Sequence, residues 1–277
     1  MIKIVKVLNN NAIVAEDIRK NTLVALGAGI AFRQKVGDWI ADSKIEKTFF
    51  SEDEKTATSI IDAFSQVRAE YIELSDRVIS EAETSSGKKL SDDIYVSLPD
   101  HLQFAVQRIK DGMQIQNRLT FETMQTYPDE FRIAQKAVEE LSRMSGLKFP
   151  DDEATNIAMH IITAEEGDSL ANTEETIKLI NEIMQIIQEM LHELDNKSVA
   201  YYRLMTHLKF FIQRIKKGQR QNDKDFDRDL YEMVAQKYHA EYIVAQRIAG
   251  IIYGRYNYQV GDEEVMFLTI HIHRVNV

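Results

Sequence analysis

Cysteine is absent from this chain of 277 residues. Its absence excludes disulfide bonds and thiolate chemistry, which suits a reducing cytoplasm. Long apolar runs are missing as well, since no stretch approaches the roughly eighteen residues that cross a bilayer. Lys3 and Lys6 interrupt the short apolar run at the N-terminus. The sequence therefore predicts a cytoplasmic protein with neither a signal peptide nor a membrane-inserted segment.

Basic residues are outnumbered, and the net charge of −10 would by itself argue against nucleic-acid binding. The charge is unevenly distributed, however. Residues 1–50 hold eight basic and five acidic side chains, a net charge of +3, which leaves −13 for the remainder. A basic N-terminal segment thus precedes an acidic body, and only the former suits a polyanionic partner.

The N-terminal segment has strand patterning. Short runs rich in valine and isoleucine ("IKIVKVL", "AIVA", "TLVAL", "IEKTFF") alternate with turn material ("NNN", "EDIRKN", "GAG", "VGDW"). From about residue 56 the apolar period becomes helical and stays so to the end. The predicted fold class is therefore α+β, with a small antiparallel sheet followed by helical domains. Such a small sheet buries little surface alone, so we expect it to oligomerise.

The helical part repeats itself. "HLQFAVQRIKDG" begins at His101 and "HLKFFIQRIKKG" begins at His207, 106 residues later. Each copy predicts an amphipathic helix in which an arginine, Arg108 or Arg214, follows the histidine by seven residues on nearly the same face. A lone histidine at a core edge is more often structural, and the duplication favours a functional interpretation.

A second match continues downstream at an offset of 111 residues, from Tyr127 against Tyr238 to the ends of the two repeats. It pairs Glu153 with Glu264 and the segment "AMHII" around His160 with "TIHIH" around His271. Each repeat therefore contains two histidines. The second repeat has five extra residues, which we expect in the polar loop "GQRQNDKDFD". Polar segments "ETSSGKK" and "AEEGDSLANTEE" are predicted as loops, the second of them separating the repeats.

Three further histidines have weaker patterns. His192 and His239 are interpreted as solvated or packing residues. His273 forms the pair "HIH" with its neighbour, but a metal site is disfavoured because no cysteine or carboxylate cluster accompanies it.

The stretch "LGAGIAF" lacks the third glycine and the following helix of a dinucleotide-binding loop. We expect a tight turn between strands that lets another backbone approach closely. The asparagines Asn9 to Asn11 are compatible with a simple turn. They are equally compatible with recognition of single-stranded or bulged RNA, for which Phe32 supplies a ring and Arg33 a cation.

The whole chain resembles the BglG/SacY/LicT transcriptional antiterminators. The resemblance rests on "KVLNNNAIV", "LGAGIAF" and "SKIEKTF" in the head and on "DHLQFA", "MHI", "THLKFF" and "LTIHI" in the repeats. It implies an RNA-binding domain at residues 1–56 and two homologous all-α PTS regulation domains at residues 65–170 and 171–277. It also implies a homodimer without enzymatic activity, cofactor or metal.

In that family a dimer of heads clamps a hairpin in a leader mRNA, so that the overlapping terminator does not form and sugar-utilisation genes are transcribed. Matching positions imply that the RNA contacts are Lys6, Asn9, Asn11, Gly27, Ala28, Gly29, Phe32 and Arg33. Ala28 stands where some relatives have a larger basic residue.

The resemblance further implies control by histidine phosphorylation. The sugar-specific PTS transporter would phosphorylate His101 and His160 and switch activity off. The phosphocarrier HPr would phosphorylate His207 and His271 and switch it on. Near His160 the chain has Thr155 and Asn156 in place of the family's usual glycine and aromatic residue.

Three alternatives differ in what they require. A DNA-binding activator with the same regulatory domains needs a helix-turn-helix head, whereas this head has strand patterning. A helical metal phosphohydrolase needs a His-Asp dipeptide, and the chain has only the reverse order at Asp100 and His101. A passive histidine phosphoacceptor explains the histidines but not the basic sheet.

Overall fold

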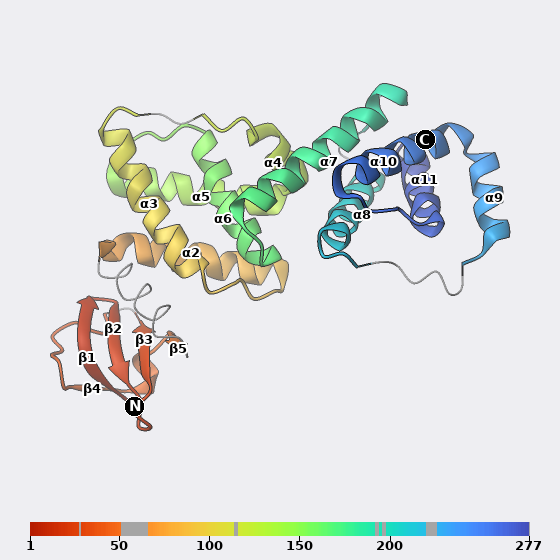
Figure 1. Ribbon diagram of the computed structural model, residues 1–277. Coiled ribbons are helices and arrows are strands. Elements are labelled where there is room, and N and C mark those ends of the chain that lie inside the picture. The colour runs from red at the N-terminus through yellow and green to blue at the C-terminus, as the bar shows by residue number, and fades with distance from the viewer. Residues whose placement is uncertain are drawn as a thin grey trace. The chain divides into compact units, whose positions relative to one another are not determined.

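The structure is a computed structural model that describes residues 1–27, 29–50, 66–113, 116–191, 194–195, 198–219 and 226–276. It divides into two compact units, Met1–Thr173 and Glu174–Val277. The first unit contains a β-sheet and helices, and the described residues of the second are helical or lie in loops (Figure 1). The predicted α+β fold class, a β domain followed by helical domains, is confirmed.

The sheet is antiparallel with the strand order β4-β1-β2-β3-β5. Its core is apolar and includes Ile4 of β1 and Ile30 of the loop that follows β3. The expected turn "VGDW" is wrong at its last residue, because Trp39 pairs with Lys3 in a two-residue edge strand too short to show alternation. The strands are β1 Ile2–Asn9, β2 Ala12–Glu16, β3 Thr22–Leu26, β4 Trp39–Ile40 and β5 Lys47–Phe50.

The first helical repeat departs from the sequence expectation at two boundaries. The helix predicted from residue 56 is not continuous, because Arg68 is extended with a ψ of 142° and α2 begins at Ala69. Residues 56–65 lie outside the described residues. The expected loop between the repeats is short, because α6 ends at Glu166 before left-handed Gly167 and α7 begins soon after. The helices of the first repeat are α2 Ala69–Ser86, α3 Ile94–Lys110, α4 Thr120–Thr126, α5 Pro128–Ser145 and α6 Asp152–Glu166, and α7 Leu170–Met190 is the first helix of the second repeat.

The second repeat has the same helices at the predicted offsets. Helices α3 and α8 end 106 residues apart, at Lys110 and Lys216. Helices α5 and α10 begin 111 residues apart, at Pro128 and His239. The five extra residues therefore fall between α8 and α10, a stretch that contains the predicted loop and also α9, which has 10 residues where α4 has 7. Residues 220–225 of that loop lie outside the described residues. The helices are α8 Val199–Lys216, α9 Arg228–Lys237, α10 His239–Tyr256 and α11 Asp262–Asn276.

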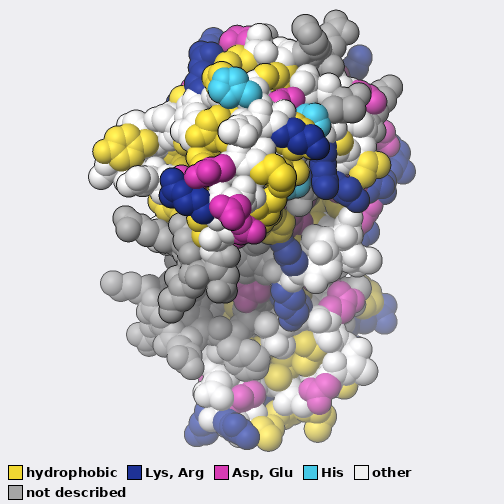
Figure 2. Space-filling model, turned by 90° about the vertical axis from the view of Figure 1, so that its right-hand side faces the viewer, with side chains coloured by type: hydrophobic (Ala, Val, Ile, Leu, Met, Phe, Trp, Pro, Cys, Tyr) yellow, Lys and Arg dark blue, Asp and Glu magenta, His cyan; other side chains and the backbone are white. Residues whose placement is uncertain are grey.

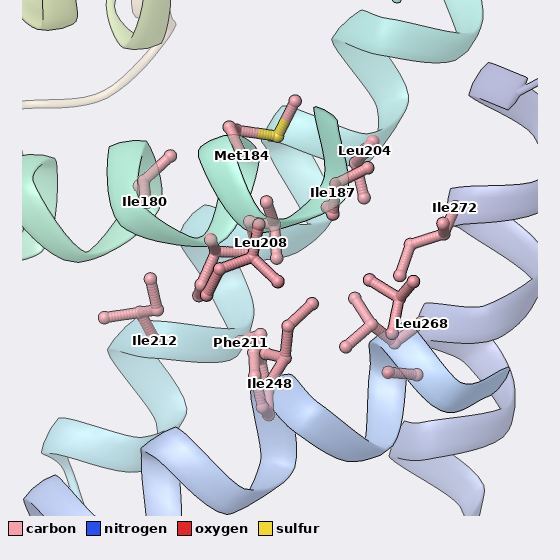
Figure 3. Packing of buried hydrophobic residues seen from close by; sticks show 14 of the residues in the cluster. Ile180, Met184, Ile187, Leu204, Leu208, Phe211, Ile212, Ile248, Leu268 and Ile272 are labelled. Carbon is pink, nitrogen blue, oxygen red and sulfur yellow. The ribbon is translucent and has the colours of Figure 1, made fainter. Parts of the chain in front are cut away.

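The core of the second unit forms where α8, α10 and α11 meet part of α7 (Figure 3). The predicted apolar stripe of α8 supplies Leu208, Phe211 and Ile212, each at most 2% exposed. They pack against Ile248 and Leu268. Burying one such side chain contributes about 1.5–3 kcal/mol to folding stability. The burial of this stripe therefore determines the orientation of α8 and with it the position of His207.

Candidate functional site

One buried polar cluster of the first repeat joins α3 to α6. His101 Nε2 lies 2.6 Å from Glu153 Oε1, and the guanidinium of Arg108 donates to Glu153 Oε2 at 2.9 Å. Both side chains reach the same carboxylate because residues seven apart lie two turns along one helix face. A carboxylate only accepts, so whenever the His101 ring is neutral its hydrogen is on Nε2 and its lone pair is on Nδ1.

His160 of α6 completes this cluster. Its ring centroid is 4.8 Å from that of His101, and its Nδ1 lies 3.3 Å from the hydroxyl of Ser97. Burial, together with the charge that His101 can acquire, lowers the pKa of His160 to about 3. The ring is therefore neutral near pH 7 and has one unprotonated nitrogen.

The second repeat builds the same cluster between α8 and α11. The guanidinium of Arg214 donates to both oxygens of Glu264 at 2.8 Å. His207 Nε2 lies 3.1 Å from Glu264 Oε1, but its geometry does not make a hydrogen bond. The rings of His207 and His271 stack with their centroids 4.6 Å apart. Burial and the neighbouring His207 lower the pKa of His271 to about 4, so this ring is also neutral near pH 7.

The two carboxylates are buried and charged. Burial would raise the pKa of Glu153 and of Glu264, but the adjacent imidazole and guanidinium outweigh it and lower both pKa values. A buried carboxylate is tolerated when it is paired and hydrogen-bonded in this way. Each glutamate therefore links its histidine to the arginine two turns further along.

The predicted RNA-contacting residues converge on the loop after β3. The backbone of Gly27 bonds to the carbonyl of Asn11, and the Gly29 amide donates to the Asn11 side chain at 2.7 Å. Asn11 is buried and shapes this loop. Gly27 confirms the expected close approach, because an added Cβ would lie 2.0 Å from the Lys44 carbonyl oxygen.

Two side chains of this loop face solvent. Phe32 is 58% exposed, and the guanidinium of Arg33 lies 5.2 Å from its ring centroid. Lys6 is exposed on β1, which ends at Asn9 beside the same loop. Ala28 lies outside the described residues. The arrangement places an exposed ring and exposed cations beside the glycine-containing loop, and single-stranded bases and phosphates require such groups.

Models of known protein families match the N-terminal head and the two helical repeats separately. The model of the CAT RNA binding domain matches residues 2–58, and the model of the PRD domain matches residues 76–164 and 178–275. The transcription antiterminator LicT of Bacillus subtilis is 38% identical over 274 residues, covering 99% of this chain and 98% of its own length. The chain belongs to the family of CAT–PRD transcription antiterminators.

Further relatives agree with this assignment. The Beta-glucoside operon antiterminator of Dickeya chrysanthemi is 33% identical over 99% of this chain and 96% of its own length. The crystal structure of GlcT CAT-PRDI is 31% identical, with a TM-score of 0.53, and covers 59% of this chain and 98% of that one. These relatives are regulators of transcription rather than catalysts.

The remaining histidines of the antiterminator lie apart from the two clusters. His273 stacks on Tyr238 with 3.8 Å between the ring centroids, and its Nδ1 lies 3.1 Å from Glu241. His239 is exposed at the start of α10, and His192 lies outside the described residues. Among the residues that the structure describes, no group of three His, Asp or Glu side chains could hold a metal ion. No helix in this described part is long and apolar enough to cross a bilayer.

The sequence assigns two histidines and one arginine to each repeat. The structure places those three residues in one cluster in each repeat. It gave no role to Glu153, Glu264 or Ser97. The signal for the two glutamates is their duplication at the offset of 111 residues, which places each on the helix of the second histidine. Ser97 has no such signal, because the equivalent position of the second repeat is Arg203.

Proposed function

We propose that this protein is a sugar-responsive transcriptional antiterminator. Its head binds a hairpin in a leader mRNA as a dimer and keeps the terminator from forming, and histidine phosphorylation by the phosphotransferase system controls it. The observation that supports this best is the duplicated cluster of two neighbouring histidines, one glutamate and one arginine in a chain with an RNA-binding head. A protein that only stored phosphoryl groups would have no use for the head.

The RNA contacts in this proposal are those of the loop after β3 and the strand end beside it. Phe32 stacks on an unpaired base, Arg33 and Lys6 bind phosphates, and the backbone of the glycine-containing loop approaches base edges. Asn11 acts by holding the loop. The full proposed set is Lys6, Asn9, Asn11, Gly27, Ala28, Gly29, Phe32 and Arg33.

The head dimerises through apolar surface that one copy leaves exposed. Val5 and Trp39 are 43% and 54% exposed on neighbouring strands of the sheet. Two heads joined in this way hold one hairpin from both sides, and the second contact is intramolecular, which increases the affinity of the dimer.

The phosphoryl acceptors are His101, His160, His207 and His271. The sugar-specific transporter phosphorylates the first pair and switches the protein off, and HPr phosphorylates the second pair and switches it on. Each accepting ring needs an unprotonated nitrogen, and the low pKa values of His160 and His271 meet this requirement near pH 7. A phosphoryl group adds up to two negative charges beside a buried carboxylate, which changes the stability of the interfaces that the repeats form.

The domains of this proposal span residues 1–56, 65–170 and 171–277, and the protein works in the cytoplasm, where transcripts and phosphocarriers occur. It is not an enzyme and requires no cofactor. A DNA-binding activator with the same regulatory domains is disfavoured by the five-stranded head, which has no recognition helix among its described residues.

The test is a reporter gene placed behind the leader terminator. We expect the combined substitution His207→Ala and His271→Ala to reduce antitermination severely while the protein stays folded. We expect His101→Ala to give activity without inducer. Strains with and without HPr phosphorylation serve as the control. Equal loss of activity from His101→Ala and His207→Ala would contradict the two-signal mechanism.

A further inference from the structure

The two histidine clusters have the same four residues but different surroundings. Four residues before the first histidine, α3 has Ser97 where α8 has Arg203. Three residues after the second histidine, α6 has Thr163 where α11 has Arg274. Residues three and four apart are neighbours on a helix surface. Two hydroxyls therefore border the first cluster, and two guanidinium groups border the second.

The two arginines are not engaged by carboxylates. Both side chains are exposed, and in the described part of the chain neither makes an ion pair. Their charges act on the second cluster: after burial and His207, Arg274 and Arg203 both contribute to the low pKa of His271. Figure 2 shows one face of the protein, on which histidine side chains lie beside Lys and Arg side chains. A pair of unpaired cations beside a neutral imidazole favours an anion.

The corresponding place in the first cluster is a cavity, and no Lys or Arg is among the described residues that line it. Ser97, His160 and Thr163 line it, together with the carboxylates of Asp93 and Asp168. The charged groups that shift the pKa of His160 are His101 and Glu153. A dianionic group on this ring would meet neutral hydroxyls and two negative side chains, so the cavity disfavours it.

We propose that Arg203 and Arg274 bind the phosphoryl group of a phosphorylated His271 or His207, and that His160, without such a pair, holds a phosphoryl group far less stably. This inference rests on the proposed phosphorylation. In the transfer, the imidazole lone pair attacks the phosphorus of a donor phosphoramidate bond. The donor N–P bond breaks, and its electron pair returns to the donor nitrogen, which takes up a proton. No oxidant or reductant is needed.

The experiment measures how long phosphohistidine persists in the full-length protein. Phosphoryl groups are introduced either by the small donor phosphoramidate, which bypasses protein docking, or by phosphorylated HPr. Site occupancy is followed by mass spectrometry at alkaline pH. The first variant combines Arg203→Ser and Arg274→Thr, and the reciprocal variant combines Ser97→Arg and Thr163→Arg.

A matched control is Arg228→Ser, which removes an exposed arginine of the same unit that pairs with Glu232 on α9. We expect the first variant to shorten the lifetime of the phosphoryl group on His271 by about tenfold with either donor. We expect the reciprocal variant to lengthen the lifetime on His160, and the control to change neither. In the first variant, NMR titration should also show a raised pKa of His271, which a merely structural role would not produce.

Three outcomes would overturn the inference. One is an unchanged lifetime in the first variant. Another is a loss confined to phosphorylation by HPr, which would make the arginines a docking site for the donor. The third is a wild-type protein that neither donor phosphorylates. If phosphoramidate phosphorylates His271 stably but HPr does not, the inference stands and the proposed regulation by HPr fails.

Discussion

Removing the arginine of the buried ion pair should cost more stability in the first repeat than in the second. The side chain of Arg108 is 9% exposed and that of Glu153 is 3% exposed, whereas the side chain of Arg214 is 33% exposed beside Glu264. Removing a buried partner leaves an uncompensated charge and costs about 3–5 kcal/mol. We therefore expect Arg108→Met to cost about 4 kcal/mol. For Arg214→Met we expect about 1–2 kcal/mol, because the Arg214 side chain is itself partly exposed and water can take its place beside the buried Glu264.

Native-state hydrogen exchange is the appropriate measurement, because a chain with several domains need not unfold in one step. Peptides from α6 report the first repeat, and peptides from α11 report the second. The combined variant Arg108→Met and Glu153→Leu is the control, since replacing both charges by apolar groups should recover most of the loss. Equal costs for Arg108→Met and Arg214→Met would refute the reasoning from burial.

The loss of stability caused by Arg108→Met should also depend on pH. The folded-state pKa of Glu153 lies below its ordinary value, so the stability it contributes is present above the unfolded pKa of about 4.5 and is lost as the pH falls through the folded pKa. In Arg108→Met the carboxyl can become protonated more readily. The difference between wild type and variant should therefore be smaller at pH 4 than at pH 7. A constant difference would exclude Glu153 as the group left unpaired.

Three further outcomes are expected. Phe32→Ala should weaken binding of the full-length protein to leader RNA by about 1–3 kcal/mol, measured by fluorescence anisotropy, and unchanged affinity would remove Phe32 from the site. Gly27→Ala should destabilise the head by about 3 kcal/mol through the clash with Lys44, seen as faster hydrogen exchange in β3, and unchanged exchange would contradict the clash. His160→Gln should make the protein less sensitive to acid, because an unfolded histidine binds a proton below about pH 6.5 while the folded ring stays neutral down to about pH 3. Melting curves at pH 7 and pH 5 test this, and an identical pH dependence of the variant would contradict it.

Much of this architecture is predictable, because the spacing of apolar residues and the duplication of the histidine-containing segments can be read from the sequence. The strand runs, the helix of each histidine and the offsets of 106 and 111 residues predict the fold class and assign two histidines to each repeat. The two-residue strand at Trp39 was not predictable, because alternation needs more residues to show. The break at Arg68 was missed as well, because the apolar period continues across it and only the backbone angle changes.

The site could be predicted only as far as its duplicated part. Glu153 and Glu264 can be recognised in the sequence as a repeated pair. Their role depends on burial, because a buried carboxylate is stable only when groups such as an imidazole and a guanidinium pair with it. Ser97 and Arg203 differ between the repeats, so comparing the two copies could not identify either as part of a common site. The structure was needed to show that both positions border a histidine cluster.

The short separation of the two histidine rings in each repeat has a consequence for the proposed phosphorylation. The centroids are 4.8 Å apart in the first repeat and 4.6 Å apart in the second. Two dianions at such a spacing repel by about 3 kcal/mol even at the dielectric constant of water. Under the proposed phosphorylation, transfer to both His101 and His160 therefore costs more free energy than transfer to either one alone. In the second repeat, the positive charges of Arg203 and Arg274 offset part of this repulsion.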